Sequence, residues 1–341
     1  MNPARPFGIE DIQEAAVRIG KHVRRTPIIA SPLLDELTGA RVLVKAEALQ
    51  LTGAFKIRGA LNKLLSMEER LRSNGVVAFS SGNHGQAISA AAKITGCPAV
   101  IVMPYDAPQV KIDGVEWWGA ETVFYDPNVE DRVEVSRKIV EARGLTLVPP
   151  FDDYVVMAGQ GTVGLEVSED VSRKGIEPDA IVVPCSGGGL SSGVIEAMNT
   201  AYPKIQSYIV ERSGFDKMAR SLASGLLCTN PDASSGYMGA IGGPRPGDRP
   251  REVLGRYDIK GLTVTEKEAT TAVQLAFRAL KLVLEPGAAA ALAAVMERKA
   301  DFHGRTVVVV ASGGNVDAGM YADILKQPSI SRHELLAGKA G

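Results

Sequence analysis

Cysteine, aromatic residues, net charge and long apolar runs are all scarce in this chain of 341 residues. The three cysteines, Cys97, Cys185 and Cys228, lie far apart without a CxxC pair, which argues against a disulfide framework or a zinc knuckle and fits a reducing cytoplasm. A formal net charge of −1 gives no electrostatic reason to expect nucleic acid or an anionic membrane as partner. No signal peptide or membrane-spanning run is visible. These absences favour small-molecule chemistry.

Short β-branched runs alternate with amphipathic segments along most of the chain. The predicted strands include 76–79, 99–103, 122–125, 180–183, 207–210 and 306–310, and the predicted helices include 86–94, 110–118, 130–142, 162–171, 190–202 and 266–283. This order predicts an α/β fold of open, mostly parallel sheets with helices on both faces. Pro149 to Asp153 break the rhythm and mark the predicted internal boundary.

One lysine stands where a strand gives way to a helix. A predicted strand, a glycine turn and a predicted helix at 58–67 place Lys56 at the junction, where side chains of open α/β sheets point into clefts. Phe55 and Ile57 flank Lys56 with apolar bulk, which would desolvate its ammonium and lower its pKa. The alternative is an ordinary solvated lysine. The stretch alone leaves the two interpretations balanced.

Three glycine-rich turns each follow a predicted strand and precede a predicted helix, an arrangement in which backbone N–H groups can hold an anion. They are Ser80-Ser81-Gly82-Asn83-His84-Gly85-Gln86, Cys185-Ser186-Gly187-Gly188-Gly189-Leu190 and Ala311-Ser312-Gly313-Gly314-Asn315. The second is the best phosphate cradle, because successive glycines let amides approach phosphate oxygens. The alternative is a Rossmann dinucleotide loop. Glu211 stands about where a ribose-binding acid is expected, but Ser192 replaces the third fingerprint glycine.

A lysine, a phosphate cradle and turns bearing Asn83 and Ser312 match the aldehyde, phosphate, phenolic oxygen and pyridine nitrogen of pyridoxal 5′-phosphate. The motifs TGAFKIRGA, SSGNHGQA, AGQGT, SGGGL and ASGGN, in this order, resemble the threonine dehydratase and serine racemase family of fold-type II pyridoxal-phosphate enzymes. The likeness spans about residues 8–326. It implies a two-domain, tryptophan synthase β-like fold and a homodimer. The implied parts are a small mobile domain at 53–147, a large cofactor-binding domain of 1–52 plus 148–326, and a C-terminal tail at 327–341.

The resemblance implies a role for each matching residue. Lys56 matches the Schiff-base lysine that also removes the substrate Cα proton, Asn83 the partner of the phenolic oxygen, and Ser312 the partner of the pyridine nitrogen. A neutral hydroxyl at that nitrogen weakens the electron sink and favours prompt loss of a β-substituent. The other implied cofactor contacts are Phe55, Ser186, Gly187, Gly188, Gly189 and Leu190. The implied substrate contacts are Ser80, Ser81, Gly82, His84 and Arg132. Helix caps, turn residues and solvated side chains are the alternatives for these polar residues.

The implied activity is β-elimination from a β-hydroxy-α-amino acid of the serine or threonine type, giving a 2-oxo acid and ammonia. Arg132 and Arg245 make 3-hydroxyaspartate an alternative substrate. Racemisation is a further alternative, because Ser81 matches the acid that faces the lysine in the racemase branch. A non-catalytic nucleotide- or cofactor-binding protein is the alternative from another class.

Two departures from the family pattern bear on function. Related enzymes often bind a divalent cation with a glutamate and a second acid six residues later, but here Lys217 follows Glu211 at that spacing and could neutralise it. No metal site is therefore predicted. The segment from Ser234 to Arg245 also differs, and Tyr237 or Arg245 could adjust the side-chain preference for substrate.

Overall fold

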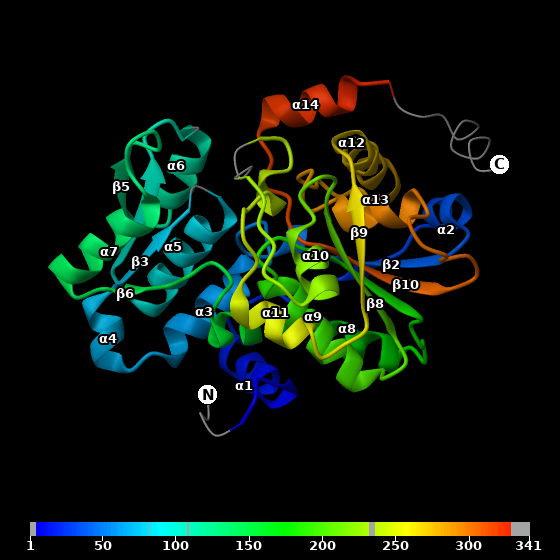
Figure 1. The fold of residues 1–341 in the computed structure, drawn as a ribbon, viewed down its shortest axis with the longest axis horizontal. Helices are drawn as coiled ribbons and strands as arrows, with labels where there is room; N and C mark the ends of the chain where they lie inside the picture. Colours follow the sequence, from blue (N-terminus) through cyan, green and yellow to red (C-terminus); the bar gives the residue numbers. More distant parts are fainter. Residues whose placement is uncertain (1–4, 81, 108, 232–235, 329–341) are drawn as a thin grey trace.

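The computed structural model describes residues 5–80, 82–107, 109–231 and 236–328. They form two sheets that lie side by side with helices packed around them (Figure 1). The larger sheet has the strand order β1 (Ile28–Ile29), β2 (Arg41–Ala46), β10 (Thr306–Ala311), β7 (Ala180–Pro184), β8 (Gln206–Arg212) and β9 (Ile259–Val264). Only the edge strand β1 pairs antiparallel. The prediction of mostly parallel sheets is confirmed.

Alternating side chains give the larger sheet a core on each face. Along β10, Val307 and Val309 pack into one hydrophobic cluster, while Val308 and Val310 pack into another. The first cluster is covered by α2 (Pro32–Thr38), α12 (Glu266–Leu275) and α13 (Ala290–Met296). The second is covered by α8 (Tyr154–Arg173), α9 (Gly189–Ala201) and α10 (Lys217–Ser224). A strand buried on both faces explains why its sequence is a continuous run of valines.

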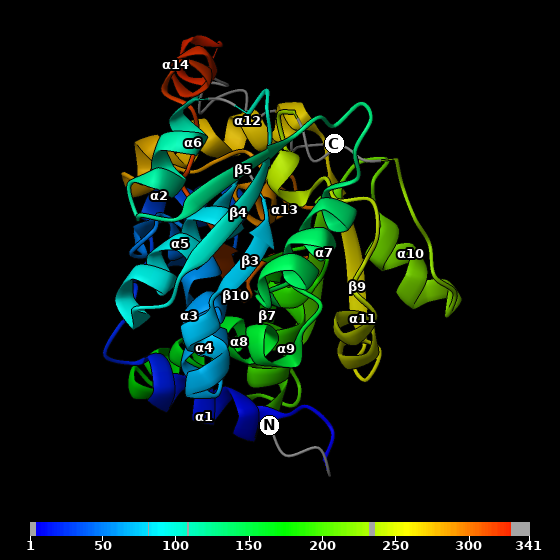
Figure 2. The same ribbon diagram turned by 90° about the vertical axis from the view of Figure 1, so that its left-hand side faces the viewer.

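The smaller sheet is wholly parallel and comes from one continuous part of the chain. Its order is β5 (Glu121–Tyr125), β4 (Ala99–Pro104), β3 (Val76–Phe79) and β6 (Thr146–Leu147). One face carries α5 (Asn83–Thr95) and α6 (Gln109–Glu116), and the other carries α7 (Arg132–Arg143) (Figure 2). The remaining elements are α1 (Ile9–Ile19), η1 (Glu47–Leu49), α4 (Glu69–Asn74), η2 (Gly239–Ile241), α11 (Asp248–Leu254), η3 (Ala276–Leu280) and α14 (Ala318–Lys326).

Helix α3 (Lys56–Ser66) lies between the two sheets and packs against α5 on one side and α8 on the other (Figure 1). Its crossing with α8 is unusually close, because a Cβ on Gly159 would lie 2.6 Å from both the Arg58 carbonyl oxygen and the Gly59 Cα. Since glycine has no Cβ, this pair of glycines lets the two backbones touch. The element that begins with Lys56 is thereby fixed against the larger sheet's helices.

Several helices differ from their predicted bounds, and the physical reason is clear for three of them. Helix α8 starts at Tyr154, eight residues before the predicted helix, because Asp153 caps it with its carboxylate, so the AGQGT motif is helical and buried. Helix α12 ends at Leu275 and passes into the π-helical turn η3 instead of continuing to Val283. The last helix starts at Ala318, capped by Asp317, rather than directly at the third glycine turn.

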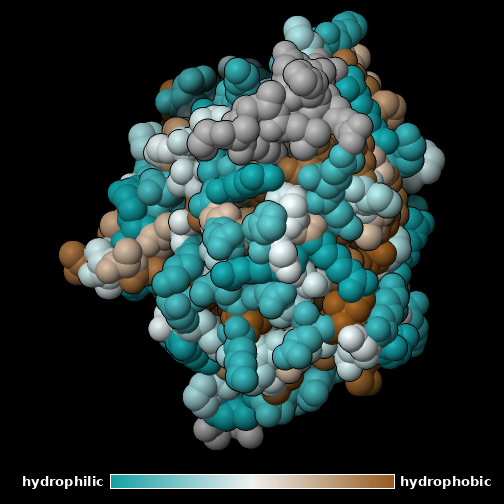
Figure 3. All heavy atoms as spheres, turned by 90° about the vertical axis from the view of Figure 1, so that its right-hand side faces the viewer, coloured by the Kyte–Doolittle hydropathy of each residue, from teal (hydrophilic) through white to brown (hydrophobic). Residues whose placement is uncertain are grey.

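Within the described residues, no helix is both long and apolar enough to cross a membrane. Hydrophilic side chains cover most of the face in Figure 3, and the hydrophobic side chains on that face form smaller separate areas.

Candidate active site

The three glycine-rich turns follow β3, β7 and β10. The first turn is linked to Lys56 through Glu285, the third through its bridge to Ala54, and the second packs against Phe151, which follows the Pro150 carbonyl that Lys56 contacts. Lys56 is the first residue of α3, and its ammonium donates to the Pro150 carbonyl oxygen at 2.6 Å. Its Nζ also lies 5.2 Å from the centre of the Phe55 ring. Burial lowers the pKa of Lys56 to about 8, although the Glu285 carboxylate opposes that shift. An amine with this pKa is substantially neutral, and so nucleophilic, in mildly alkaline solution.

The first turn meets the third turn through Asn83. The Asn83 side-chain amide donates to Glu285 Oε1 at 2.6 Å and accepts from Asn315 Nδ2 at 2.8 Å. Asn315 also donates to the Thr52 carbonyl oxygen at 2.8 Å. These contacts orient the amide with its nitrogen toward Glu285, and one of its two N–H groups remains for a ligand. Neither Glu285 nor a role for Asn315 is among the sequence predictions.

The third turn is packed against backbone, so it does not act as an anion cradle at a helix start. Gly313 forms an isolated bridge with Ala54, and Phe55 N donates to the Ser312 carbonyl oxygen at 3.1 Å. A Cβ on Gly314 would lie 2.6 Å from the Val283 carbonyl oxygen. Ser312 is buried, and its hydroxyl makes no hydrogen bond within the described residues. It is free to bind a ligand atom.

The second turn has the features of a phosphate cradle. Gly188, with φ +92°, is the N-cap of α9, and within the part of the chain that is described no hydrogen bond is donated by the amides of 186–189. Such amides at a helix N-terminus attract an anion. The Ser186 hydroxyl accepts from Gly243 N at 3.3 Å. Leu190 is buried in the first turn of α9 and helps to anchor the loop.

The segment that joins β6 to α8 contacts the predicted site residues at three points. The Val148 carbonyl oxygen lies 3.0 Å from His84 Nε2, and the Pro150 carbonyl oxygen accepts from Lys56. The Phe151 ring packs against the second turn, where a Cβ on Gly187 would lie 2.4 Å from ring atoms. The sequence assigned this segment only to a domain boundary, because its prolines and aspartates signal a break in periodicity.

His84 is 4% exposed and neutral. Burial and the Lys56 charge lower the pKa of His84 to about 3. A neutral imidazole has a single N–H, and here that hydrogen is directed to the Val148 carbonyl oxygen. A hydrogen bond to a substrate carboxylate would require the ring to give up this contact. The predicted carboxylate role stays a prediction.

Among the remaining predicted substrate contacts, Ser80 and Gly82 lie directly after β3. Gly82 caps α5, and its amide donates to the Ser80 hydroxyl at 3.1 Å. Arg132 begins α7 on the other face of the smaller sheet, and its guanidinium carbon lies 5.7 Å from the centre of the Phe79 ring. Ser81 lies outside the described residues.

A largely buried charge network is centred on Arg58, two residues after Lys56. Arg58 is fully buried, pairs with Glu47 at 2.8 Å and Glu166 at 2.7 Å, and Lys45 pairs with Glu166 at 2.5 Å. Although burial disfavours its charge, the two carboxylates raise the pKa of Arg58 above its ordinary value. Two cations and two anions are thus mutually neutralised.

Glu211 and Lys217 are both fully buried next to the second turn. Lys217 Nζ lies 3.4 Å from Glu211 Oε1, and the carboxylate also accepts from the amides of Met218 and Ala219. Met218 in turn packs against Gly188, whose Cβ would lie 2.5 Å from the methionine methyl carbon. Within the described residues, no three His, Cys, Asp or Glu side chains are grouped as metal ligands.

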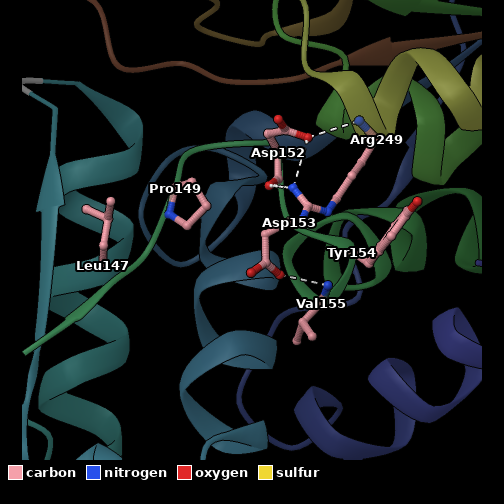
Figure 4. Close-up of a pocket in the computed structure, with 7 residues that line it drawn as sticks. All are labelled: Leu147, Pro149, Asp152, Asp153, Tyr154, Val155 and Arg249. Carbon is pink, nitrogen blue, oxygen red and sulfur yellow. Dashed lines mark hydrogen bonds and ion pairs between the residues drawn. The ribbon is translucent and has the colours of Figure 1, made fainter. Parts of the chain in front are cut away.

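A pocket of about 460 Å³ lies beside this site (Figure 4). Leu147 and Pro149 line one side, and Arg249, hydrogen-bonded to Asp152, lines the other. No predicted site residue lines it. It is therefore distinct from the convergence around Lys56.

The residues around Lys56 fit pyridoxal 5′-phosphate. The site offers a buried amine of lowered pKa for the aldehyde, unpaired amides at a helix N-terminus for the phosphate, a spare amide N–H for the phenolic oxygen and an unpaired hydroxyl for the ring nitrogen. These donor groups match each polar part of the cofactor.

Comparisons with known proteins agree with that fit. A family profile described as pyridoxal-phosphate dependent enzyme matches residues 19–313. The chain is 38% identical to an L-threo-3-hydroxyaspartate ammonia-lyase of Pseudomonas sp, over 93% of this chain and 98% of that one. It is 37% identical to an L-threonine ammonia-lyase of Thermotoga maritima, over 94% of this chain and 78% of that one. The structure of maize serine racemase superimposes with a TM-score of 0.87 at 35% identity, covering 94% of this chain and 97% of that one. The chain belongs to the fold-type II family of pyridoxal-phosphate dependent enzymes.

Proposed function

We propose that this protein is an ammonia-lyase that eliminates the hydroxyl group of a serine- or threonine-type amino acid to give a 2-oxo acid and ammonia. The observation that carries the proposal is the buried Lys56 amine, with a pKa of about 8, which has Glu285 as a common neighbour with the Asn83 amide. The buried Ser312 hydroxyl adds a second polar group for the cofactor. When bound, the cofactor supplies electron withdrawal that acidifies the substrate Cα–H. The relatives named above include lyases for two such hydroxy amino acids.

Each site residue then has a physical task. The Lys56 amine, neutral above its pKa, accepts the proton from the substrate Cα. Asn83 holds the phenolic oxygen, and Ser312 holds the ring nitrogen with a neutral hydroxyl. Phe55 packs against the cofactor ring beside Lys56, and the amides of 186–189 bind phosphate. Ser80, Gly82 and Arg132 are the substrate contacts that the family resemblance implies.

Release of oxo acid from a substrate panel tests the proposal. The panel contains the L and D isomers of serine and threonine and the isomers of 3-hydroxyaspartate. We expect turnover of at least one L-hydroxy amino acid. Absence of turnover with every member would refute the lyase assignment. A visible cofactor band that is lost in Lys56→Ala distinguishes an enzyme of this family from a protein that only binds nucleotides or cofactors.

Specific observations favour two alternatives to this proposed activity. Elimination from 3-hydroxyaspartate is favoured by Arg132, which would add a cation near a second carboxylate, and by the name of the Pseudomonas relative. Racemisation is favoured by the maize structure's name and by a serine at position 81. If Ser81 is the acid opposite Lys56, then Ser81→Ala abolishes racemisation and spares elimination from an L-substrate.

The proposal extends to the whole protein. We infer that residues 53–147 move as a small domain on a large domain of 1–52 and 148–326, that the active protein is a cytoplasmic homodimer, and that no divalent cation is needed. The single-segment origin of the smaller sheet supports the first inference. The ion pair between Lys217 and Glu211 supports the last, since it already neutralises the carboxylate.

A further inference from the structure

An unusual backbone conformation leads the chain to Glu285 and places this residue in the site. After α12 the chain forms the π-helical turn η3, and Lys281 adopts a left-handed conformation with φ +58°. A left-handed lysine is strained, and π-helical turns are frequent at functional sites. The chain then runs along the third glycine turn, where Glu285 N donates to the Gly313 carbonyl oxygen at 3.2 Å.

Gly313 makes room for the Glu285 carboxyl group. A Cβ at position 313 would lie 2.6 Å from Glu285 Oε1, closer than any ordinary contact. The same carbon would lie 3.4 Å from Asn83 Nδ2. The absence of a side chain therefore lets the carboxyl group and the Asn83 amide meet at 2.6 Å.

Asn83 has a limited number of hydrogens to donate. Its oxygen is taken by Asn315, and one of its two N–H groups is taken by Glu285. Under the proposed function, the other N–H serves the phenolic oxygen of the cofactor, which carries negative charge when ionised. A carboxylate and a phenolate would then share one amide nitrogen as their donor.

Two cations face Glu285. They are Lys56 from α3 and Lys111 from α6, and both favour the ionised carboxylate. Burial has the larger and opposite effect, and it raises the pKa of Glu285 to about 7. Under the proposed function, the Lys56 nitrogen would bond to the cofactor aldehyde, and the positive charge left on it would be balanced by the adjacent phenolic oxygen. Lys56 would then stabilise the Glu285 carboxylate less, just as a second anion arrives.

We propose that Glu285 takes up a proton when the cofactor binds, and that its neutral carboxyl group positions Asn83 for the phenolic oxygen. Glu285 is a positioning residue in this inference, which rests on the proposed function for the identity of the bound group. The proton comes from solvent, one per site, and no bond other than that O–H forms on Glu285. A carboxylic acid keeps one oxygen to accept from Asn83, so the amide stays in place.

The direction of the pH dependence follows from this uptake. If cofactor binding raises the proton affinity of Glu285, affinity for the cofactor must fall as pH rises above the value at which free Glu285 ionises. The loss ends at the higher pH where Glu285 also ionises in the complex. Between these limits, this group changes the dissociation constant by up to about tenfold per pH unit.

The test compares the unsubstituted full chain with Glu285→Gln, which is isosteric and can accept from Asn83 but cannot ionise. Apoprotein is titrated with pyridoxal 5′-phosphate between pH 6.5 and 9. Calorimetry in two buffers of different ionisation enthalpy, free of primary amines and phosphate, counts the protons exchanged. We expect the unsubstituted chain to take up as much as one more proton per site near pH 8 than Glu285→Gln, and the ratio of their dissociation constants to rise with pH. Equal uptake would overturn the inference.

Glu268→Gln is the matched control. It removes a carboxylate from the first turn of α12, outside the site, and glutamine preserves the capping hydrogen bond to Thr265 N. We expect its proton uptake to equal that of the unsubstituted chain. A decrease as large as that in Glu285→Gln would overturn the inference, because it would show that the uptake is not specific to Glu285.

A second measurement needs no substitution, so it remains decisive if Glu285→Gln does not fold. The unsubstituted chain is titrated with 3-deoxypyridoxal 5′-phosphate, which lacks the phenolic oxygen. We expect a smaller proton uptake than with the complete cofactor; equal uptake would contradict the inference. Failure of the proposed function is recognised separately, because then neither compound produces a visible absorption band with Lys56.

Discussion

His84 and Lys56 are buried bases whose pKa values are lowered mainly by burial. Their consequences differ. The pKa of Lys56 lies close enough to neutral pH for its amine to be either charged or neutral, which suits proton transfer. His84, with a pKa of about 3, stays neutral throughout the physiological range and holds α5 to the Val148 carbonyl oxygen. It is a structural contact that becomes unfavourable only in acid.

The lowered pKa of His84 predicts a loss of stability in acid. The folded state resists protonation of this ring, so its contribution is fully present above the ordinary value of 6.5 and is lost as pH falls toward about 3. The loss is at most about 1.4 kcal/mol per pH unit in that window. His84→Gln, which can keep an N–H donor for Val148, should show a shallower decline in the free energy of unfolding. Denaturant titrations from pH 7 to 4 measure this decline in the free energy of unfolding.

His303→Gln, at an exposed position, is the control for this measurement and should follow the unsubstituted chain. The interpretation fails if His84→Gln loses stability in acid as steeply as the unsubstituted chain.

At the residue scale, the sequence was informative where polar residues stand in glycine-rich motifs. Lys56, Asn83 and Ser312 were predicted from such motifs. In the structure Lys56 and Asn83 have Glu285 as a common neighbour, and the Ser312 carbonyl oxygen accepts from the amide of Phe55, next to Lys56. Glu285 was not predicted, because its neighbours Leu282 to Leu284 continue the apolar pattern of a helix. Its contact with Asn83 spans 202 residues. Nothing local in the sequence signals a pairing of that kind.

The crossing of α3 and α8 should be sensitive to a single methyl group. Gly159→Ala places a Cβ against α3 backbone atoms at 2.6 Å, and backbone cannot move aside as a side chain can. We expect a loss of about 1–3 kcal/mol in the free energy of unfolding, together with weaker cofactor retention because Lys56 begins the displaced helix. Thermal unfolding and the visible absorption band report the two effects.

Gly161→Ala provides the comparison, because the two atoms nearest to its added Cβ belong to the flexible side chain of Ile12, and the nearest backbone atom, Gly193 O, lies at 3.0 Å rather than 2.6 Å. It should cost less stability and should leave the band unchanged. A band lost equally in both variants would refute the special role of the α3 crossing.

The buried pair at the start of α10 predicts a second element-scale effect. Lys217→Met keeps the bulk and removes the charge, which leaves the buried Glu211 carboxylate without a cation. We expect a loss of about 3–5 kcal/mol in the free energy of unfolding. The double variant Lys217→Met, Glu211→Gln should recover much of this loss. Measured unfolding of Lys217→Met, Glu211→Gln, the double variant and the unsubstituted chain gives the coupling.

The same pair bears on metal dependence. Saturating Mg²⁺ or Ca²⁺ should change neither the activity nor the melting temperature of the unsubstituted chain. A strong rise in either quantity would contradict the inference that Lys217 already neutralises Glu211.

The predicted elements were most accurate where burial is uniform and least accurate where helices end. The valine runs of β7 and β10 were placed correctly, because strands buried on both faces carry an unbroken apolar signal. The end of α12 was misplaced, because the π-helical turn and the left-handed Lys281 preserve the apolar spacing of a helix. The start of α8 was missed because the glycines of AGQGT resemble a turn; in the structure they let α8 pack closely on α3 and α9.

At the scale of the whole molecule, the proposed mobility of residues 53–147 can be tested in solution. The close contact of Gly59 with Gly159 makes rotation about α3 the easier movement, because separation would break this packing. Saturation of the cofactor-loaded protein with L-alanine, which has no β-hydroxyl to lose, should reduce the radius of gyration measured by X-ray scattering.

The reference for this experiment is the Lys56→Ala variant, which lacks the amine, measured with the same addition of L-alanine. An unchanged radius in the cofactor-loaded protein would count against domain closure.

The overall fold was predictable because strands and helices alternate repeatedly along the chain, and parallel strands follow from that order. The division into two sheets was harder to predict from the sequence, because it depends on which strands pair. β10 lies between β2 and β7, far from both in sequence.

The charge network of Lys45, Glu47, Arg58 and Glu166 bears on how evolution could alter this enzyme. An obvious way to keep an amine uncharged is to place a permanent cation nearby, and Arg58 is only two residues away. Yet the charge on Arg58 is cancelled by Glu47 and Glu166, so burial alone discourages the ammonium. Substitution of either glutamate by glutamine would expose Lys56 to an unbalanced positive field without touching the active site. The basicity of the Lys56 amine can therefore be lowered from a distance, by residues that never meet the substrate.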